Sequence, residues 1–162
     1  ITNIELDEGA QFTMESTQLG GVTYTDRKTY AKIGDRAQLI VKEKILTDAE
    51  EMAVTDFQVE LVGRESRADI VSRSVARGKS KQEFRSDLIG KNSCFGHVEC
   101  DGILLEGARI ISVPQIDAVD PEASLVHEAA VGKIAGEQLM KLMSLGLTEQ
   151  EAEDAVIQGF LN

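Results

Sequence analysis

The sequence predicts a mostly β protein that ends in a small helical part. Apolar and polar residues alternate with a period of two over much of residues 11–116, and the period becomes helical after Pro121. Glycines that mark turns recur at intervals of about 12 to 17 residues, with one gap of 29. Short strands between regularly spaced turns are typical of a sandwich, a barrel or a coiled solenoid, and periodicity alone does not choose among these three.

The strands are predicted from the alternation within short segments. In AVTDFQVEL, residues 53–61, every odd-numbered position is apolar or Thr, whereas positions 56, 58 and 60 are polar. The same alternation recurs in FRSDLIG at 84–90 and in CFGHVECDGIL at 94–104, where Cys94 and Cys100 fall on the apolar face. Such segments are half-buried strands. The turns between strands are signalled by Gly34, Gly63, Gly78, Gly90 and Gly107.

Two helices are predicted after the strands. The first, near 136–145, carries Leu139, Leu142 and Met143 on one side and ends at Gly146, a natural left-handed terminator. The second, near 149–160, begins with T-E-Q-E, a capping box that starts at Thr148. Its apolar stripe is formed by Ala152, Ala155, Val156 and Phe160.

These patterns divide the chain into a β core at 1–118 and a helical part at 119–162. From the residues alone, the helices read either as packing elements on the core or as a docking surface for a partner. The chain has 162 residues, 42% of them hydrophobic, which is enough to bury a core without disulfides or metals.

Charge and composition exclude several classes of function. The net charge of −11 argues against non-specific nucleic-acid binding, because phosphates require positive charge. No apolar run is long enough to span a membrane, and the amino end lacks the features of a secretory signal. Two cysteines fit a reducing compartment better than a disulfide framework. We therefore expect a cytoplasmic protein without a membrane partner.

The carboxy-terminal segment carries the most specific signal. SLVHEAAVGKIAGEQLMKLMSLGLTEQEAEDAVIQGF at 124–160, preceded by HVECDGILL at 97–105, resembles the carboxy-terminal half of the SufB/SufD family, the scaffold proteins of the SUF iron-sulfur cluster assembly machinery. The resemblance implies a right-handed parallel β-helix core followed by a helical subdomain. Family members are usually longer at the amino end, so the chain is expected to correspond to their carboxy-terminal portion.

The resemblance also implies partners. In SufB/SufD proteins the carboxy-terminal helices bind the ABC ATPase SufC, which favours the docking interpretation. The expected contact residues are Leu139, Leu142, Met143, Leu147, Glu151, Ala155 and Phe160. The resemblance further implies a sulfur donor protein and a dimer, either a homodimer or a SufB/SufD-type heterodimer.

Three residues are candidate ligands for a transient iron-sulfur cluster. A buried lone Cys is more often a small hydrophobe, but SufB members carry a Cys like Cys100 in the E-C-D strand, and the chain is therefore somewhat more SufB-like. The family motif H-E-A-T implies His127 as a ligand and Glu128 as a weaker second ligand. Without the resemblance, the same two residues indicate a solvated His-Glu pair at the start of a helix. Adjacent residues point to opposite faces of a strand, so both could join one coordination shell only from a loop or helix start.

Other interpretations stay open. His97, Glu99 and Asp101 share the outward phase of their strand and would suit a hard metal, but an exposed polar face explains them more simply. No nucleophile, zinc-protease or phosphate-loop motif is present, so we do not expect an enzyme. The alternative to a cluster scaffold is a structural, SufD-like β-solenoid without its own cluster ligand.

Overall fold

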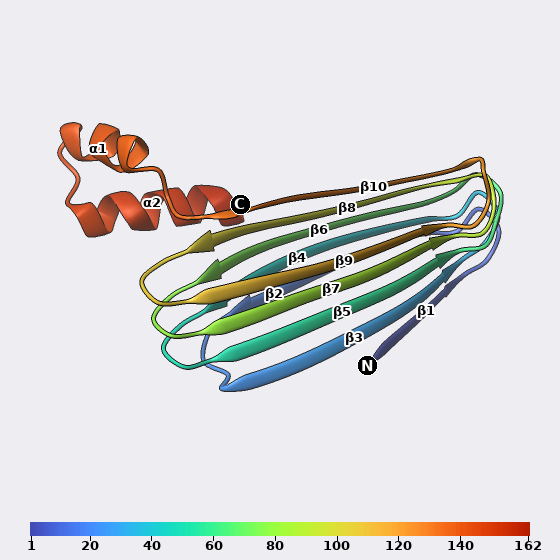
Figure 1. Cartoon of the computed structure of the whole chain (residues 1–162), viewed down its shortest axis with the longest axis horizontal. Coiled ribbons are helices and arrows are strands. Elements are labelled where there is room, and N and C mark those ends of the chain that lie inside the picture. Colours follow the sequence, from blue (N-terminus) through green and yellow to red (C-terminus); the bar gives the residue numbers. More distant parts are fainter.

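A computed structural model describes all 162 residues, as ten strands and two helices. The strands are long, mostly nine to eleven residues, and follow one another through short turns (Figure 1). Their bounds are β1 Thr2–Leu6, β2 Gln11–Leu19, β3 Tyr24–Ile33, β4 Gln38–Thr47, β5 Met52–Leu61, β6 Ser66–Ala76, β7 Lys81–Gly90, β8 Cys94–Leu104, β9 Arg109–Ala118 and β10 Ala123–Gly132. The helices are α1 Gly136–Ser144 and α2 Glu149–Leu161.

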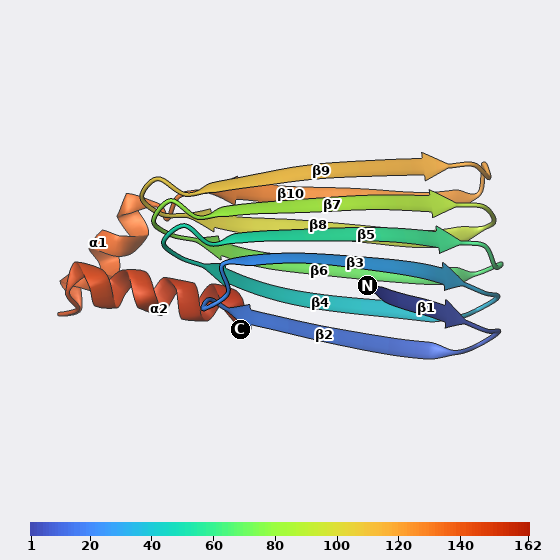
Figure 2. The same cartoon turned by 90° about the horizontal axis from the view of Figure 1, so that it is seen from below.

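Successive strands alternate between two five-stranded parallel sheets. One sheet has the order β1-β3-β5-β7-β9 and the other, here called sheet B, has the order β10-β8-β6-β4-β2. Each coil of the chain contributes one strand to each sheet, and Figure 2 shows the coils stacked side by side. The predicted mostly β fold, a parallel β-helix followed by two helices, is confirmed. Strand β10 follows Pro121, so the β-helix includes residues that the sequence analysis grouped with the helices.

The core lies between the two sheets and consists of the inward-facing side chains. The largest fully buried apolar ones are Ile33, Leu39, Leu61, Ile70 and Leu88. Every odd-numbered position of β5 from 53 to 61 is buried, as the alternation in the sequence predicts. Each such Leu or Ile contributes about 1.5–3 kcal/mol by leaving water, so the coils are held together mainly by this interior.

The turn glycines are required where neighbouring coils approach closely. A Cβ on Gly63 would lie 2.1 Å from the Gly34 carbonyl carbon and from the Asp35 nitrogen. A Cβ on Gly34 would lie 2.8 Å from the Leu6 carbonyl oxygen. The backbone of one turn thus occupies the space that a side chain on the next turn would need, which explains why glycine recurs at these turns.

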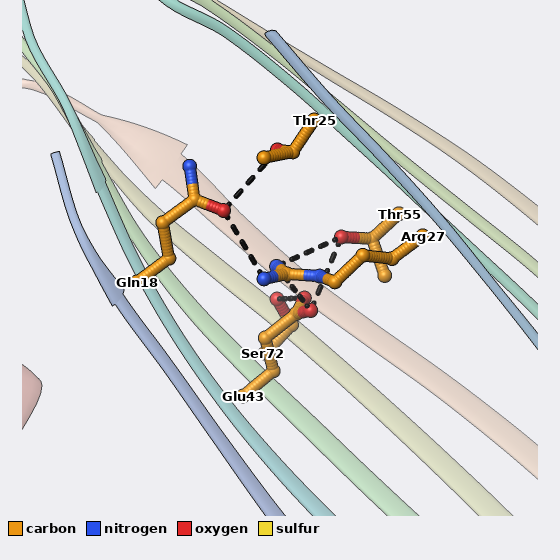
Figure 3. A network of polar contacts seen from close by, with 6 residues as sticks. All are labelled: Gln18, Thr25, Arg27, Glu43, Thr55 and Ser72. Carbon is orange, nitrogen blue, oxygen red and sulfur yellow. Dashed lines mark hydrogen bonds and ion pairs between the residues drawn. The ribbon is translucent and has the colours of Figure 1, made fainter. Parts of the chain in front are cut away.

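A buried polar network interrupts the apolar interior near β2 (Figure 3). It consists of Gln18, Thr25, Arg27, Glu43, Thr55 and Ser72. The Glu43 carboxylate accepts from Arg27 at 2.9 Å, from Thr55 at 3.1 Å and from Ser72 at 3.0 Å. Burial raises the pKa of Glu43, and these partners oppose the shift.

The helices lie at the end of the β-helix towards which the strands of sheet B run (Figure 1). Thr148 and Glu151 form the predicted capping box at the start of α2. Arg77, the residue after β6, forms an ion pair with Asp154 of α2 at 2.7 Å, and Arg73 of β6 donates to the carbonyl of Phe160 at 3.1 Å. Contacts from β6 therefore hold α2 against the β-helix. Neither helix has the length and apolar character that a membrane crossing needs.

Replacing Arg27 by Met should destabilise the chain more strongly as the pH rises. The variant leaves the Glu43 carboxylate buried without its cationic partner, which should cost roughly 3 kcal/mol at pH 7.5. Folding raises the pKa of Glu43, so protonation of this carboxyl stabilises the folded state. This stabilisation is fully present below the pKa of Glu43 in the unfolded chain and is lost as the pH rises through its pKa in the folded chain. Removing Arg27 raises the pKa of Glu43 further, because Arg27 opposes the shift in the wild-type chain. Urea unfolding should therefore show a smaller loss of stability in the variant at pH 5 than at pH 7.5.

The matched control is Lys91→Met, which breaks the exposed Lys91–Glu60 ion pair, also 2.9 Å long. Its effect should stay below about 1 kcal/mol and vary little with pH. Similar losses in the two variants would contradict a stabilising role for the buried network.

Candidate functional site

The three predicted cluster ligands lie on β8 and β10, which are neighbours in sheet B. In the parallel register, His127 stands opposite Val98, Glu128 opposite Glu99, and Ala129 opposite Cys100. Since consecutive residues of a strand point to opposite faces, this register sends Cys100 and His127 inward and Glu128 outward. The structure thus brings two of the three predicted ligands to one face and separates the third.

Cys100 and His127 form the inner face of the candidate site. Cys100 is 1% exposed, and burial raises the pKa of its thiol, an effect that the neighbouring Ser112 hydroxyl opposes. Burial also lowers the pKa of His127, and the charge of His97 adds to this shift. The Nε2 atom of His127 is buried without a hydrogen-bond partner. A neutral imidazole with an unused nitrogen is suited to metal ligation.

Glu128 belongs instead to a cluster on the outer face of sheet B. The ligand atoms of His97, Glu99 and Glu128 all lie within 4.8 Å of one another, and His97 Nε2 is 3.7 Å from Glu128 Oε2. The other ring nitrogen of His97 lies 2.8 Å from Asp69 Oδ1 of β6, and this hydrogen bond is the main cause that raises the pKa of His97. Three neighbouring strands therefore build the cluster.

Cys94 and Asp101, which the sequence analysis also placed in the strand that contains Cys100, lie outside both groups. Cys94 is buried at the start of β8 opposite Ala123, six residues from Cys100 along an extended strand. It lies within the main hydrophobic core, which agrees with a structural role. The Asp101 carboxylate accepts from the Ala130 amide at 3.1 Å and thereby ties β8 to β10.

The candidate site lies in the last coil, whose interior is not covered by a further coil. Ile116 of β9 and Val131 of β10 are in register with buried Leu88 and Gly102, so both point inward. Each is nevertheless 41% exposed. Strands β9 and β10 are also the edge strands of their sheets, with one backbone edge unpaired. The inner face of the site therefore lies beside an open, partly apolar end of the β-helix.

The residues predicted to contact an ATPase lie on both helices and, in the case of Leu147, on the turn between them. Leu142, Ala155 and Phe160 line one shallow hollow between α1, α2 and the end of β8. Met143 is exposed, Leu139 and Leu147 are half-buried, and the Glu151 carboxylate is engaged by Thr148. Two exposed apolar residues that the sequence analysis did not select are Met140 and Leu145.

The comparison with protein families agrees with this architecture. The family model described as "SUF system FeS cluster assembly, SufBD core domain" matches residues 1–160. The chain belongs to the SufBD family. This confirms the resemblance carried by the carboxy-terminal motifs and connects the β-helix to a family that takes part in iron-sulfur cluster assembly.

Curated SufBD relatives come from several archaea, and their names describe them as iron-sulfur cluster assembly SufBD family proteins. One from Archaeoglobus fulgidus is 34% identical over 162 residues, which cover 99% of this chain and 44% of that protein. One from Pyrococcus horikoshii is 32% identical, over 99% of this chain and 50% of that protein. One from Methanothermobacter thermautotrophicus is 43% identical over 107 residues, or 65% of this chain and 26% of that protein. This SufBD chain spans half or less of these relatives.

The outer cluster is the feature of this SufBD chain that sequence reasoning missed. His97 and Glu99 were grouped with Asp101, their neighbour in the same strand, whereas the structure groups them with Glu128 of β10. The length of one coil is the signal in the sequence that could have revealed this cluster, because Glu99 and Glu128 stand opposite each other and are 29 residues apart. The gap of 29 residues between two turn glycines is the same repeat.

Cys100 should react slowly with iodoacetamide in the folded chain. Burial both shields the thiol and raises its pKa, so the reactive thiolate is scarce. In a Cys94→Ser background at pH 8, alkylation followed by mass spectrometry should be at least roughly tenfold slower in buffer than in denaturing urea. Equal rates in both conditions would show that Cys100 is not enclosed.

Proposed function

We propose that the chain is a scaffold component of the SUF system that helps to build nascent iron-sulfur clusters at an interface between two protomers. The observation that carries this proposal is that Cys100 and His127 point to the same inner face of two adjacent strands, two positions apart in register. A thiol and an imidazole with an unpartnered nitrogen are ligand types that iron-sulfur centres use. The expected cluster is transient, a cargo of the scaffold and not a resident cofactor.

The ligand count supports a shared site. Iron-sulfur clusters usually need four protein ligands, and the inner face offers one thiolate and one imidazole. The missing ligands would come from a second protomer or from sulfide and small thiols. Ligation of this kind is weak, which suits a protein that hands its cluster on. The sulfur would come from a separate donor protein.

The open last coil supports a protomer interface beside this site. Ile116 and Val131 point inward yet remain 41% exposed, so a partner that covers them would bury apolar surface. The edges of β9 and β10 offer unpaired backbone groups to the same partner. A homodimer and a SufB/SufD-type heterodimer would both satisfy these requirements.

The helices support docking of a SufC-like ABC ATPase. Helix α1 buries none of its residues, although it carries four apolar side chains, those of Leu139, Met140, Leu142 and Met143. Met140 and Leu145 are 65% and 75% exposed, and Met143 is 41% exposed. Adaptable methionine side chains at an exposed surface are common in binding sites. The ATP chemistry would then belong to the partner, and the chain itself would be non-enzymatic and cytoplasmic.

The second candidate is a structural, SufD-like partner subunit. The observation that favours it is the burial of Cys100, because a thiol that is 1% exposed packs as a small hydrophobe. In this case the helices would still bind the ATPase, but the inner face would hold no cluster. Comparison of cluster retention with ATPase binding separates the two functions.

Anaerobic reconstitution with ferrous iron and sulfide should give a cluster that the wild-type chain retains and the Cys100→Ser chain loses. His127→Ala should reduce retention as well, because the second inner ligand is removed. Absorption spectra and iron content after desalting measure retention, and Cys94→Ser is the matched control that should behave like wild type. Equal spectra in wild type and Cys100→Ser would favour the structural subunit.

Met143→Glu should weaken binding of a purified SufC-like ATPase without unfolding the chain. The substitution places a charge on an exposed apolar surface, and loss of such an anchor typically costs more than about 1 kcal/mol, or at least roughly fivefold in Kd. Glu137→Gln, on the exposed first turn of α1, is the control. Unchanged affinity in Met143→Glu, measured by calorimetry, would argue against this docking surface.

A further inference from the structure

The outer cluster of His97, Glu99 and Glu128 has the geometry of an ion site that the inner-face function does not use. Ligand atoms that bind the same transition-metal ion at about 2.0–2.2 Å lie roughly 3–4 Å from one another. His97 Nε2 is 3.7 Å from Glu128 Oε2, and all three ligand atoms lie within 4.8 Å. A small rotation of the Glu99 or Glu128 side chain is enough to bring the three atoms around one ion.

The orientation of His97 is a second, independent observation. Asp69 Oδ1 lies 2.8 Å from Nδ1 of the imidazole, which directs Nε2 towards Glu128. Histidines that bind metals almost always donate their other ring nitrogen to a carboxylate or carbonyl in this way, which fixes the ring and its tautomer. His97 is only 21% exposed, so the ring is also held by its neighbours.

We propose that His97, Glu99 and Glu128 bind a divalent first-row transition-metal ion on the outer face of sheet B, with Asp69 orienting His97. The donor set is one imidazole nitrogen and two carboxylates, without sulfur. Such a mixed set suits Fe²⁺, Mn²⁺ or Zn²⁺ and disfavours Cu⁺, which prefers soft thiolates and thioethers. Binding of an ion does not depend on the proposed scaffold role; the assignment of Fe²⁺ as the natural ion rests on it.

Local electrostatics agree with a dication. Glu99 and Glu128 place two carboxylates on the same face, and a bound dication would be attracted to both. The nearby cation of β6, Arg73, acts on Glu99 through its charge. Arg73 donates to the carbonyl of Phe160 at 3.1 Å, so its guanidinium is held by α2.

The position of this site connects it to the inner face. Glu99 precedes Cys100 in β8, and Glu128 follows His127 in β10. The same two strands thus carry the outer ion on one side and the proposed cluster ligands on the other. Because β10 is an edge strand, the two faces adjoin each other at its free edge. An outer site of this kind would hold iron beside the place where it is consumed.

The test is anaerobic equilibrium dialysis of the whole chain at pH 7.5 against Co²⁺, with its visible absorption as a signature of coordination, followed by competition with Fe²⁺, Mn²⁺ and Zn²⁺. Wild type should bind one ion per chain. Glu99→Gln and His97→Gln should each weaken binding by roughly 100-fold, and Asp69→Asn by roughly tenfold. Glu15→Gln removes an exposed carboxylate of β2 that lies 3.9 Å from Lys42, and should leave the affinity unchanged.

Two readouts keep this proposal separate from the cluster scaffold. Cys100→Ser should lose the reconstituted cluster and keep Co²⁺ binding, whereas a chain that binds Co²⁺ but never retains a cluster would leave the ion site intact and remove the scaffold role. Circular dichroism checks that each variant is folded. Glu99→Gln and His97→Gln both change partly exposed side chains, so either variant still tests the site if the other fails to fold. The proposal is overturned if wild type shows no saturable binding, or if these two variants bind Co²⁺ as tightly as wild type.

Discussion

The in-register stacking of parallel coils is the constraint on which the rest of the molecule depends. Each strand pairs with the strand one coil earlier, so a residue that points inward in one coil stands beside an inward residue in the next. The interior can then be filled by ladders of Leu, Ile and Val between two sheets. The same stacking requires glycine where turns lie on one another, as at Gly34 and Gly63. It also permits one buried acid, Glu43, only because Arg27 and two hydroxyls lie in adjacent coils.

Register also decides what the last coil can do chemically. His127 and Glu128 are adjacent in sequence, but β10 is extended there, so they serve opposite faces of sheet B. On the inner face, burial lowers the pKa of His127 and raises the pKa of the Cys100 thiol, which favours the neutral form of both. The outer face is open to water and rich in carboxylates, with His97 held between Asp69 and Glu128. The thiol of Cys100 and the carboxylates of Glu99 and Glu128 therefore lie on opposite sides of one pair of strands.

Much of this was accessible from the sequence, because alternation and turn glycines report local geometry. Residues 53–61 and the Thr148 capping box were predicted correctly since each depends on neighbours within a few positions. The β-helix itself required the family resemblance, as period-two strands fit several architectures. The outer cluster was missed because it depends on which residues of different coils stand opposite each other. Glu99 and Glu128 meet through a 29-residue register that no local pattern displays.

The open edge of β10 links the two faces to one another. A second protomer that pairs with this edge would extend sheet B by one strand, and the alternation of that strand would be fixed by the register of pairing. Its inward residues would then lie beside His127 and its outward residues beside Glu128. The proposed ligands of the inner face and the solvent-exposed side of the outer face would therefore be altered by the same docking event. Coverage of Ile116 and Val131 would supply the apolar burial that favours this docking.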